Sequence, residues 1–293
     1  MNPPKKVAAI HDLSALGRCA LTVILPTLSV MGYQVVPIPT ALLSTHTGGY
    51  TDMHFRDLTD DMERISEHFQ SLGTTFDSLY TGFLGSTHQI QTVERFLCTF
   101  GSSKNGSHPL VLVDPVMGDD GELYSTYTPE LAKGIAHLCQ FASVITPNLT
   151  EACFLTDISY RDTKLLSEQE LDRYVNNLMD ALQVKFHCRT VITGIHQKNG
   201  SVANLCADED GSRFWSAQPE CGHSYPGTGD IFASVLLGEL LRGTAFATAV
   251  EQSAAFVAHL IRVSVKIPTP TREGVALEPE LWRLALPHKN ERN

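Results

Sequence analysis

The residues best placed to do chemistry are residues 227–230, which read GTGD and stand directly before a long apolar run. Glycine lets a backbone approach a ligand closely, and the free N–H groups at the start of a helix attract an anion. An isolated aspartate before a helix is most often only an N-cap. Here Gly227 and Gly229 suggest an anion cradle, beside which a carboxylate is electrostatically costly. We therefore interpret Asp230 as a base that accepts a proton from an attacking hydroxyl.

A second group of carboxylates lies in the stretch DPVMGDDGELY, residues 114–124. For Asp120 and Glu122 a solvated turn is the better interpretation. Asp114 differs, because it ends a predicted strand, where a carboxylate associated with Mg²⁺ would be useful. Further along the chain, Asn148 and Glu151 stand three residues apart at the start of a predicted helix. They form either a helix cap with its capping-box acid or a second set of oxygens for the same cation, and their spacing leaves both open.

The elements that must position these residues alternate along the chain. Expected strands at 5–13, 78–85 and 189–194 are interleaved with expected helices at 18–33, 57–73, 86–101 and 167–183. Such alternation indicates an α/β fold with a mainly parallel sheet covered on both faces. The strands 201–207 and 213–218 flank the turn 208–212 and predict a hairpin. We expect a terminal helix around 279–286. We expect one domain, residues 1–293.

Two prolines interrupt the β-branched segment 34–45. Because Pro37 and Pro39 are poor in a central strand, we expect this segment to leave the main sheet at its end, as a small β excursion over about 36–55. In an open parallel sheet, ligands bind beyond the C-terminal ends of the strands. Those ends should gather the following residues at one rim: Asp12, Ser14, the STHTGGY loop, TGFLG, 114–122, 146–151, Thr193 and Gly194.

Bulk properties exclude several classes of protein. The formal net charge of −10 argues against a nucleic-acid partner. No apolar stretch approaches membrane-spanning length, so we expect no membrane association. Seven scattered cysteines favour reduced thiols in a cytoplasmic protein. Neither a Walker A motif nor a G-x-G-x-x-G after the first strand occurs. The twelve histidines do not have the spacing of a metal triad. His46 alone is kept as a site candidate, because it lies in a rim loop.

Taken in order, several segments resemble the ribokinase-like superfamily and, within it, the pyridoxal (vitamin B6) kinases. The segments are IHDLSALGRCAL, STHTGGY, YTGFLGS, VDPVMGD, ITPNLTEA and PGTGDIFAS, and they cover nearly the whole chain. GTGD alone indicates only the superfamily, whereas the ordered set is similar to the B6 kinases and their relative, hydroxymethylpyrimidine kinase. The resemblance implies a three-layer α/β/α sandwich with a small β lid. It also implies ATP-dependent phosphorylation of a vitamer's 5′-hydroxymethyl group.

The resemblance assigns roles to individual residues. Asp230 matches the catalytic base, and the backbone of Gly227, Thr228 and Gly229 matches the anion hole for the transferred phosphoryl group. On the ATP side, the resemblance implies that Asp114 and Glu151 lie at the metal and that Asn148 belongs to the magnesium–phosphate network. It implies that Asp119 and Tyr127 lie on a flap over ATP. It also implies that Thr193, Gly194 and Thr228 contact the nucleotide. On the substrate side it implies Thr47, and Phe83 in place of the usual tyrosine, joined by His46 and Asp12. ATP and Mg²⁺ are the implied cofactors; a monovalent cation such as K⁺ is left open, and a homodimer is implied.

One departure from the family pattern concerns Asp12. Pyridoxal kinases often have a serine after the first strand, where its hydroxyl meets the polar edge of the pyridine ring. A carboxylate there would favour a protonated ring nitrogen or an amine, so pyridoxamine or an aminopyrimidine becomes more plausible as substrate. The alternatives are a hydroxymethylpyrimidine kinase, a sugar or nucleoside kinase, and a non-catalytic vitamer-binding regulatory protein. The intact GTGD and DPVMGD segments disfavour the non-catalytic protein.

Overall fold

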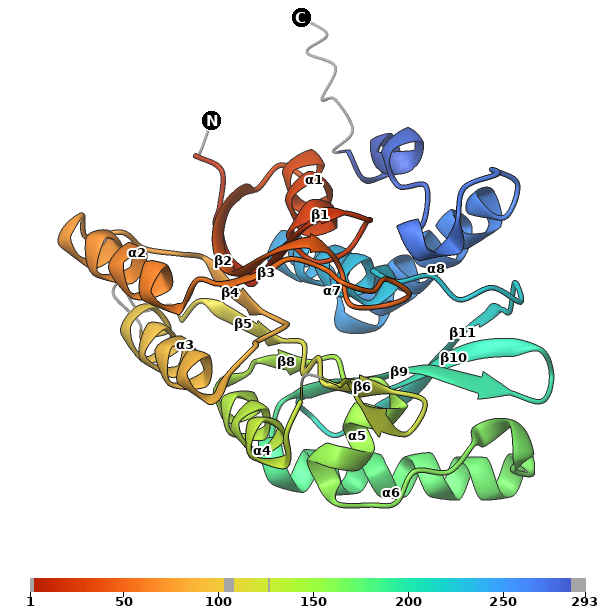
Figure 1. Ribbon diagram of the computed structural model, residues 1–293. Helices are drawn as coiled ribbons and strands as arrows, with labels where there is room; N and C mark the ends of the chain where they lie inside the picture. The colour runs from red at the N-terminus through yellow and green to blue at the C-terminus, as the bar shows by residue number, and fades with distance from the viewer. Residues whose placement is uncertain (1–2, 103–107, 126, 286–293) are drawn as a thin grey trace, which may run out of the picture.

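The computed structural model describes residues 3–102, 108–125 and 127–285, which form a three-layer α/β/α sandwich (Figure 1). The strands are β1 (Lys6–Leu16), β2 (Gln34–Thr45), β3 (Phe55–Asp57), β4 (Ser78–Thr81), β5 (Leu110–Val113), β6 (Gly118–Asp119), β7 (Glu122–Leu123), β8 (Val144–Ile145), β9 (Arg189–Gln197), β10 (Ser201–Ala207) and β11 (Arg213–Pro219). The α-helices are α1 (Leu21–Val30), α2 (Thr59–Ser71), α3 (Thr87–Phe100), α4 (Pro129–Leu138), α5 (Leu149–Thr156), α6 (Glu168–Phe186), α7 (Thr228–Arg242) and α8 (Phe246–Ser264). Short 3₁₀ helices are η1 (Cys139–Phe141), η2 (Thr163–Leu165), η3 (Thr271–Glu273) and η4 (Glu278–Leu284).

The central sheet has the strand order β11-β10-β9-β8-β5-β4-β1-β2-β3. The strands from β9 to β2 in this order run parallel, whereas β3, β10 and β11 pair antiparallel with their neighbours. The mainly parallel sheet and the predicted hairpin of β10 and β11 are therefore confirmed. The C-terminal ends of the parallel strands meet at one edge of the sheet, which is where the rim residues were expected.

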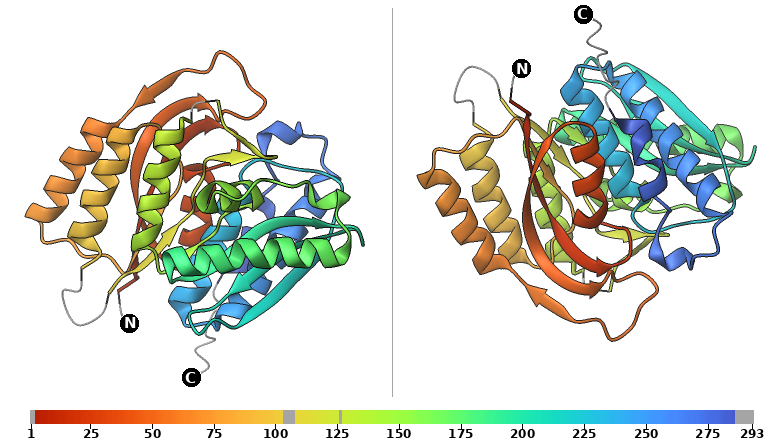
Figure 2. Two further views of the ribbon diagram at one scale, coloured as in Figure 1. Left: turned by 90° about the horizontal axis from the view of Figure 1, so that it is seen from below. Right: turned by 90° about the horizontal axis from the view of Figure 1, so that it is seen from above.

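Each face of the sheet has its own hydrophobic core. Helices α2 to α6 cover one face, with a core that includes Ile10, Leu79 and Val113, and α1, α7 and α8 cover the other (Figure 2). The alternation of side chains along β1 explains the division, since Ala8 and Ile10 face the first core while Val7 and Ala9 face the second. No helix in the described ranges is long and apolar enough to cross a membrane.

The segment with the two prolines differs from expectation. Strand β2 does not leave the sheet, because it pairs with β1 along its length, from Lys6↔Gln34 to Leu16↔Thr45. Pro37 and Pro39 are two residues apart, so their missing N–H groups belong to the same edge of the strand. Among the described residues, strand β3 pairs only with residues 41–43 of β2, so that edge has no strand partner there beside the prolines. The excursion is built by the extended ends of β1 and β2 together with β3.

The C-terminal segment also departs from expectation. Where a terminal helix was predicted around 279–286, the structure has the 3₁₀ helix η4, and residue 286 lies outside the described residues. The segment from η3 to η4 runs back to the loop that follows β1. There Arg18 donates its backbone N–H to the Glu273 carbonyl at 3.0 Å, and its guanidinium binds Glu278. This contact joins the end of the chain to the rim.

Candidate active site

Helix α7 presents its N-terminus to the rim, and Gly227 makes this possible. It is the N-cap residue, with φ 78°, a conformation that side chains rarely adopt. A Cβ on Gly227 would lie 1.9 Å from the Arg18 carbonyl oxygen, so the loop after β1 packs directly on the cradle. Gly229 is exposed, and nothing lies within 4 Å of the position of a Cβ there. The first turn of α7 is therefore held tightly on one side and open on the other.

Asp230 lies in that first turn and is half-buried. Its Oδ2 accepts a hydrogen bond from the backbone N–H of Ala20 at 2.8 Å. Burial raises the pKa of Asp230 to about 7; the Ala20 N–H opposes the rise and the charge of Asp12 adds to it. Asp230 is thus a carboxylate whose ionisation falls near neutrality, as suits a general base.

Asp114 follows β5 at the same edge of the sheet and is buried, with 7% of its surface exposed. Thr146 Oγ1 donates a hydrogen bond to Asp114 Oδ1 at 3.0 Å. Burial and the neighbouring charge of Asp230 raise the pKa of Asp114 to about 8. The structure therefore brings the two carboxylates close enough to repel each other.

Asn148 and Glu151 form a reciprocal capping box at the start of α5. Glu151 donates its N–H to Asn148 Oδ1 at 2.9 Å and accepts the Asn148 N–H at 2.8 Å. Glu151 also accepts the Met117 N–H, and Asn148 Nδ2 donates to the Gly118 carbonyl, so the pair holds the start of the β6–β7 hairpin. Burial and Asp114 raise the pKa of Glu151 well above its usual range. The cap is confirmed, and the roles at a metal and its phosphates stay predictions.

The β6–β7 hairpin is the predicted flap. Asp120 and Glu122 are exposed on it, as expected for a solvated turn, and Asp119 is exposed as well, while its contact with ATP stays a prediction. Tyr127 lies elsewhere: it is buried, and its ring packs edge-on against Phe83, with 5.9 Å between ring centroids. Its hydroxyl is buried and has no hydrogen-bond partner among the described residues. Tyr127 therefore contacts the side of the rim where substrate is expected, and its assignment to the ATP flap stays a prediction.

Thr193 and Gly194 form an irregularity in β9, where the register with β10 shifts. Thr193 bridges to Asn148, and its N–H donates to the Pro147 carbonyl at 2.9 Å. Gly194 has φ 72° and donates its N–H to Asn204 Oδ1. The bulge thus places the two residues beside the capping box of α5, at the rim, while their contact with nucleotide stays a prediction.

The opposite end of the rim is formed by the end of β1 and the loop after it. Asp12 is buried, and Ser14 Oγ donates to its Oδ2 at 2.8 Å. Burial raises the pKa of Asp12. Cys19 is also buried, and burial together with the charges of Asp230 and Asp12 raises the pKa of its thiol. Cys19 therefore lies near both carboxylates as an uncharged thiol.

His46 and Thr47 lie at the tip of the excursion, and the His46 ring is engaged within the chain. Its Nδ1 accepts the Gly48 N–H at 3.1 Å, so Nε2 carries the proton that is donated to the Arg272 carbonyl at 2.6 Å. The Tyr50 ring contacts both the His46 ring and the Arg272 guanidinium. Both ring nitrogens are therefore engaged, Nδ1 within the loop and Nε2 in holding the excursion to η3. A direct contact of His46 with substrate, like one of half-buried Thr47, stays a prediction.

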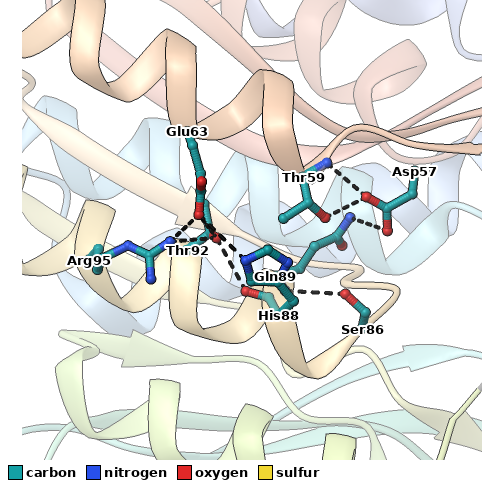
Figure 3. Close-up of polar contacts among 8 residues, drawn as sticks. All are labelled: Asp57, Thr59, Glu63, Ser86, His88, Gln89, Thr92 and Arg95. Carbon is teal, nitrogen blue, oxygen red and sulfur yellow. Dashed lines mark hydrogen bonds and ion pairs between the residues drawn. The ribbon is translucent and has the colours of Figure 1, made fainter.

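Phe83 is held through a polar network around Gln89 at the base of the excursion, of which Figure 3 shows the contact between Gln89 and Asp57. Fully buried Gln89 accepts the Gly85 N–H at 2.8 Å and donates to the Thr40 carbonyl at 2.7 Å and to Asp57 Oδ2 at 3.2 Å. Thr40 Oγ1 in turn donates to the Phe83 carbonyl. The network ties β2, β3 and α3 to the loop after β4, and it fixes where Phe83 lies.

Sequence reasoning missed Ala20. Its N–H is the hydrogen-bond donor to the Asp230 carboxylate, but an alanine side chain has no polar group that could mark the position. The carboxylates share another property: no ion pair among the described residues involves Asp12, Asp114, Glu151 or Asp230. The rim is therefore a row of acidic groups that lacks a cation from the described chain.

A three-layer α/β/α sandwich of this topology, with an acidic rim and a glycine cradle, defines a kinase of the ribokinase-like fold. Residues 24–272 match the model of the phosphomethylpyrimidine kinase family, and the chain belongs to this family. A hydroxymethylpyrimidine/phosphomethylpyrimidine kinase from Haemophilus influenzae is 27% identical, over 89% of this chain and 92% of its own.

Solved structures of similar proteins point in two directions. A provisionally assigned phosphomethylpyrimidine kinase from Bacteroides thetaiotaomicron is 37% identical, with a TM-score of 0.87 over 98% of this chain and 96% of its own. An orthorhombic form of that protein with pyridoxal has a TM-score of 0.85. A pyridoxal kinase from Lactobacillus plantarum is 29% identical, with a TM-score of 0.85 over 96% of both chains. The chain is thus a phosphotransferase of the pyridoxal and hydroxymethylpyrimidine kinase group.

Proposed function

We propose that the protein transfers the γ-phosphoryl group of ATP to the 5′-hydroxymethyl group of a B6 vitamer: pyridoxal, pyridoxine or pyridoxamine. The observation that carries the transfer is the position of Asp230, a half-buried carboxylate with a pKa of about 7 beside the open side of the cradle. The choice of vitamer is supported by the 37% identical relative, which has been crystallised with pyridoxal.

In this mechanism the protein contributes position and charge. Asp230 accepts the proton of the substrate hydroxyl while the oxygen of that hydroxyl attacks the γ-phosphorus of ATP. The N–H groups of Gly227, Thr228 and Gly229 stabilise the charge on the transferring group, because they lie at the N-terminus of α7. Since Asp230 acts as a base only when ionised, kcat/KM should rise with pH through about 7.

The residues of the rim fit a bound Mg²⁺. No group of three or more His, Cys, Asp or Glu side chains in the described ranges could hold a metal ion by itself. Asp114 and Glu151 nevertheless offer oxygen ligands, and burial raises both pKa values, with a further rise from the charge of Asp230 at Asp114 and from that of Asp114 at Glu151. Mg²⁺ in kinases takes one or two carboxylates together with substrate phosphates, which matches this donor set. When bound, the ion would neutralise phosphate charge, and Asp114 and Glu151 would hold it.

The second candidate is phosphorylation of hydroxymethylpyrimidine, supported by the family match and by the H. influenzae relative. Asp12 favours hydroxymethylpyrimidine as the substrate, because a buried carboxylate binds an aminopyrimidine better than an uncharged aldehyde. The Ser14 hydroxyl donates its hydrogen bond to Oδ2 of Asp12 rather than to Oδ1. We propose that Oδ1 accepts a hydrogen bond from a protonated ring nitrogen or an amino group of the substrate. Among the vitamers, the same contact would favour pyridoxamine.

A substrate panel tests the proposal. The purified protein is given ATP and Mg²⁺ with pyridoxal, pyridoxine, pyridoxamine, hydroxymethylpyrimidine or its monophosphate, and the phosphorylated products are quantified by mass spectrometry. We expect at least one vitamer to be phosphorylated with a kcat/KM at or above that of the pyrimidine. Turnover of the pyrimidines alone would replace the proposal by the second candidate. Binding of vitamers without turnover of any of the five would refute both.

Three further properties are proposed from the resemblance. The protein should act in the cytoplasm, form a homodimer that includes the β2–β3 excursion, and fold as one domain. Sedimentation velocity of the parent and of a Phe55→Asp variant tests the dimer, because Phe55 is an exposed aromatic residue on the edge strand β3. A monomeric parent protein would contradict it.

A further inference from the structure

Ala20 has a backbone conformation that is unusual for a residue with a side chain. Its φ is 49° and its ψ is −135°. The other non-glycine residues with positive φ in the described ranges are aspartates and one histidine, such as Asp157 with φ 57° and ψ 25°. Those values lie in the left-handed helical region, which aspartate tolerates. The ψ of Ala20 places it outside that region, in a conformation typical of glycine, and strain of this kind clusters at functional sites.

The neighbours of Ala20 hold it in this conformation from both sides. Before it, the Arg18 N–H donates to the Glu273 carbonyl at 3.0 Å, and the Arg18 carbonyl packs against Gly227. After it, the Ala20 carbonyl accepts the N–H groups of Val23 and Ile24, at 3.1 and 3.0 Å, in the first turn of α1. Strained residues persist where the surroundings over-determine their geometry, and here the C-terminal segment and α1 do so.

The result of this geometry is the direction of the Ala20 N–H, which points at Asp230 Oδ2 over 2.8 Å. Among the described residues, no other hydrogen bond to the Asp230 side chain is formed. We propose that Ala20 is a positioning residue of the phosphotransfer reaction: its strained backbone holds one N–H against the carboxylate of the base and keeps that carboxylate ionised and oriented. The inference rests on the proposed function for its meaning in catalysis, but the hydrogen bond can be tested without turnover.

The physical role of this N–H follows from what surrounds Asp230. Burial and the charge of Asp12 both favour the protonated form, in which Asp230 cannot accept a proton. A hydrogen bond donated to the carboxylate favours the ionised form instead. Loss of the N–H should therefore raise the pKa of Asp230 and leave less of the active base at neutral pH.

Replacing the Ala20 amide by an ester tests this directly. Incorporation of lactic acid at position 20 removes the N–H and keeps the methyl group. The pKa of Asp230 is read by NMR of protein with ¹³C-carboxyl-labelled aspartate, with its signal assigned through the Asp230→Asn variant. We expect a rise of about one to two pH units, the value for loss of a hydrogen bond to a charged group. An unchanged pKa would overturn the proposal.

The same substitution at Ala245 is the matched control. Ala245 is also an alanine at a helix N-cap without a side-chain bond, but it is exposed, and its φ is −58°. The ester there should leave the Asp230 pKa unchanged. If the panel has shown turnover, the acid limb of the single-turnover rate should move with the pKa, and KM for ATP should stay the same. A shifted pKa without turnover would refute the proposed function and leave the hydrogen bond standing.

The strain is tested by stability. Ala20→Gly and Ala245→Gly place the same residue at two helix N-caps, so the difference between them reports the relief of strain at Ala20 less the loss of its buried methyl group. We expect Ala20→Gly to have a Tm about 2–4 °C above that of Ala245→Gly, because glycine adopts the conformation without strain. An equal or lower Tm for Ala20→Gly would show that the conformation is not strained and would overturn that part of the proposal.

Discussion

Two polar regions of this molecule lie close to the rim and differ in how completely their polar groups are paired. In the network around Gln89, part of which Figure 3 draws, every hydrogen-bonding atom of the buried Gln89 amide has a partner. In the row of rim carboxylates, like charges face one another: Asp230 raises the pKa of Asp114, and Asp114 raises that of Glu151. The first region links β2, β3 and α3, whereas the second lies where the parallel strands end.

The difference distinguishes polar groups that stabilise the fold from polar groups that can take part in chemistry. Buried polar groups stabilise a fold when they are fully satisfied, and they destabilise it when charge is left uncompensated. A satisfied network has no capacity left for a ligand. The rim carboxylates, with raised pKa values and no ion-pair partner among the described residues, can bind a cation or accept a proton. Substitutions in the two regions should therefore have opposite effects on activity and stability.

The largest expected effect is on turnover at the rim. Asp230→Asn keeps the shape of the side chain and an oxygen for the Ala20 N–H, but it removes the base. We expect kcat to fall by about a hundredfold to ten-thousandfold, the usual range for loss of a general base, while binding of ATP measured by calorimetry persists. Asp157→Asn, at an exposed helix end, is the control and should keep the parent kcat. A near-normal kcat for Asp230→Asn would refute the assignment.

The next effect is on stability in the network. Gln89→Leu leaves Asp57 Oδ2 and the Gly85 N–H without the amide as partner and removes one of the two hydrogen bonds to the Thr40 carbonyl, so the free energy of unfolding should fall by about 2–4 kcal/mol. Urea denaturation measures it. The neighbouring Gln91 is exposed on the same helix, and Gln91→Leu should change stability by no more than about 0.5 kcal/mol. Equal losses in both variants would mean that the network does not stabilise the fold.

A smaller effect is the pH dependence of stability. The pKa values of Asp230 and Asp114 are raised to about 7 and about 8, so the folded state holds protons that the unfolded state releases above about pH 4. The free energy of unfolding should therefore decrease as pH rises from about 4 to about 8. The double variant Asp114→Asn, Asp230→Asn should show a flatter profile. A steeper decrease in the double variant would contradict the repulsion.

The smallest effect concerns the choice of substrate. Asp12→Ser removes the carboxylate and should shift the ratio of kcat/KM for pyridoxamine to that for pyridoxal by about tenfold toward pyridoxal, since a hydrogen bond to a charged group is lost. Ser14→Ala is the control, because it removes only the hydroxyl that donates to Asp12. If pyridoxal is already strongly preferred by the parent protein, the role of Asp12 is refuted.

Most of the fold follows from local patterns. The alternation of apolar strands and amphipathic helices predicts the parallel sheet. The helix expected at 86–101 agrees with α3, which ends before Gly101, whereas the one expected at 167–183 ends three residues before the end of α6. The prolines of β2 misled, because tolerance of Pro37 and Pro39 depends on an edge without a partner strand, which only the assembled sheet reveals. Spacing along the chain could not decide between a cap and a ligand for Asn148 and Glu151 either; the capping box itself is an observation of the structure.

The site divides in the same way. Asp230 and Asp114 can be recognised in the sequence, because each is a carboxylate that stands next to an apolar run. Ala20 does not, since its contribution is a backbone N–H directed by contacts with residues more than two hundred positions away, such as Glu273. Likewise, the engagement of His46 Nε2 requires the Arg272 carbonyl, which no local pattern connects to the excursion. Chemistry carried by side chains can be predicted, whereas positions set by long-range backbone contacts cannot.

The most direct test of the contrast is to measure kcat and the free energy of unfolding on the same preparations of Asp230→Asn and Gln89→Leu at pH 8. Asp230→Asn should lose at least about a hundredfold in kcat and be as stable as the parent protein or more so, because it removes a buried charge. Gln89→Leu should lose stability and keep most of its kcat while folded. If Asp230→Asn were instead strongly destabilised with turnover intact, Asp230 would be a structural cap, and the assignment of the rim as the site of phosphotransfer would be contradicted.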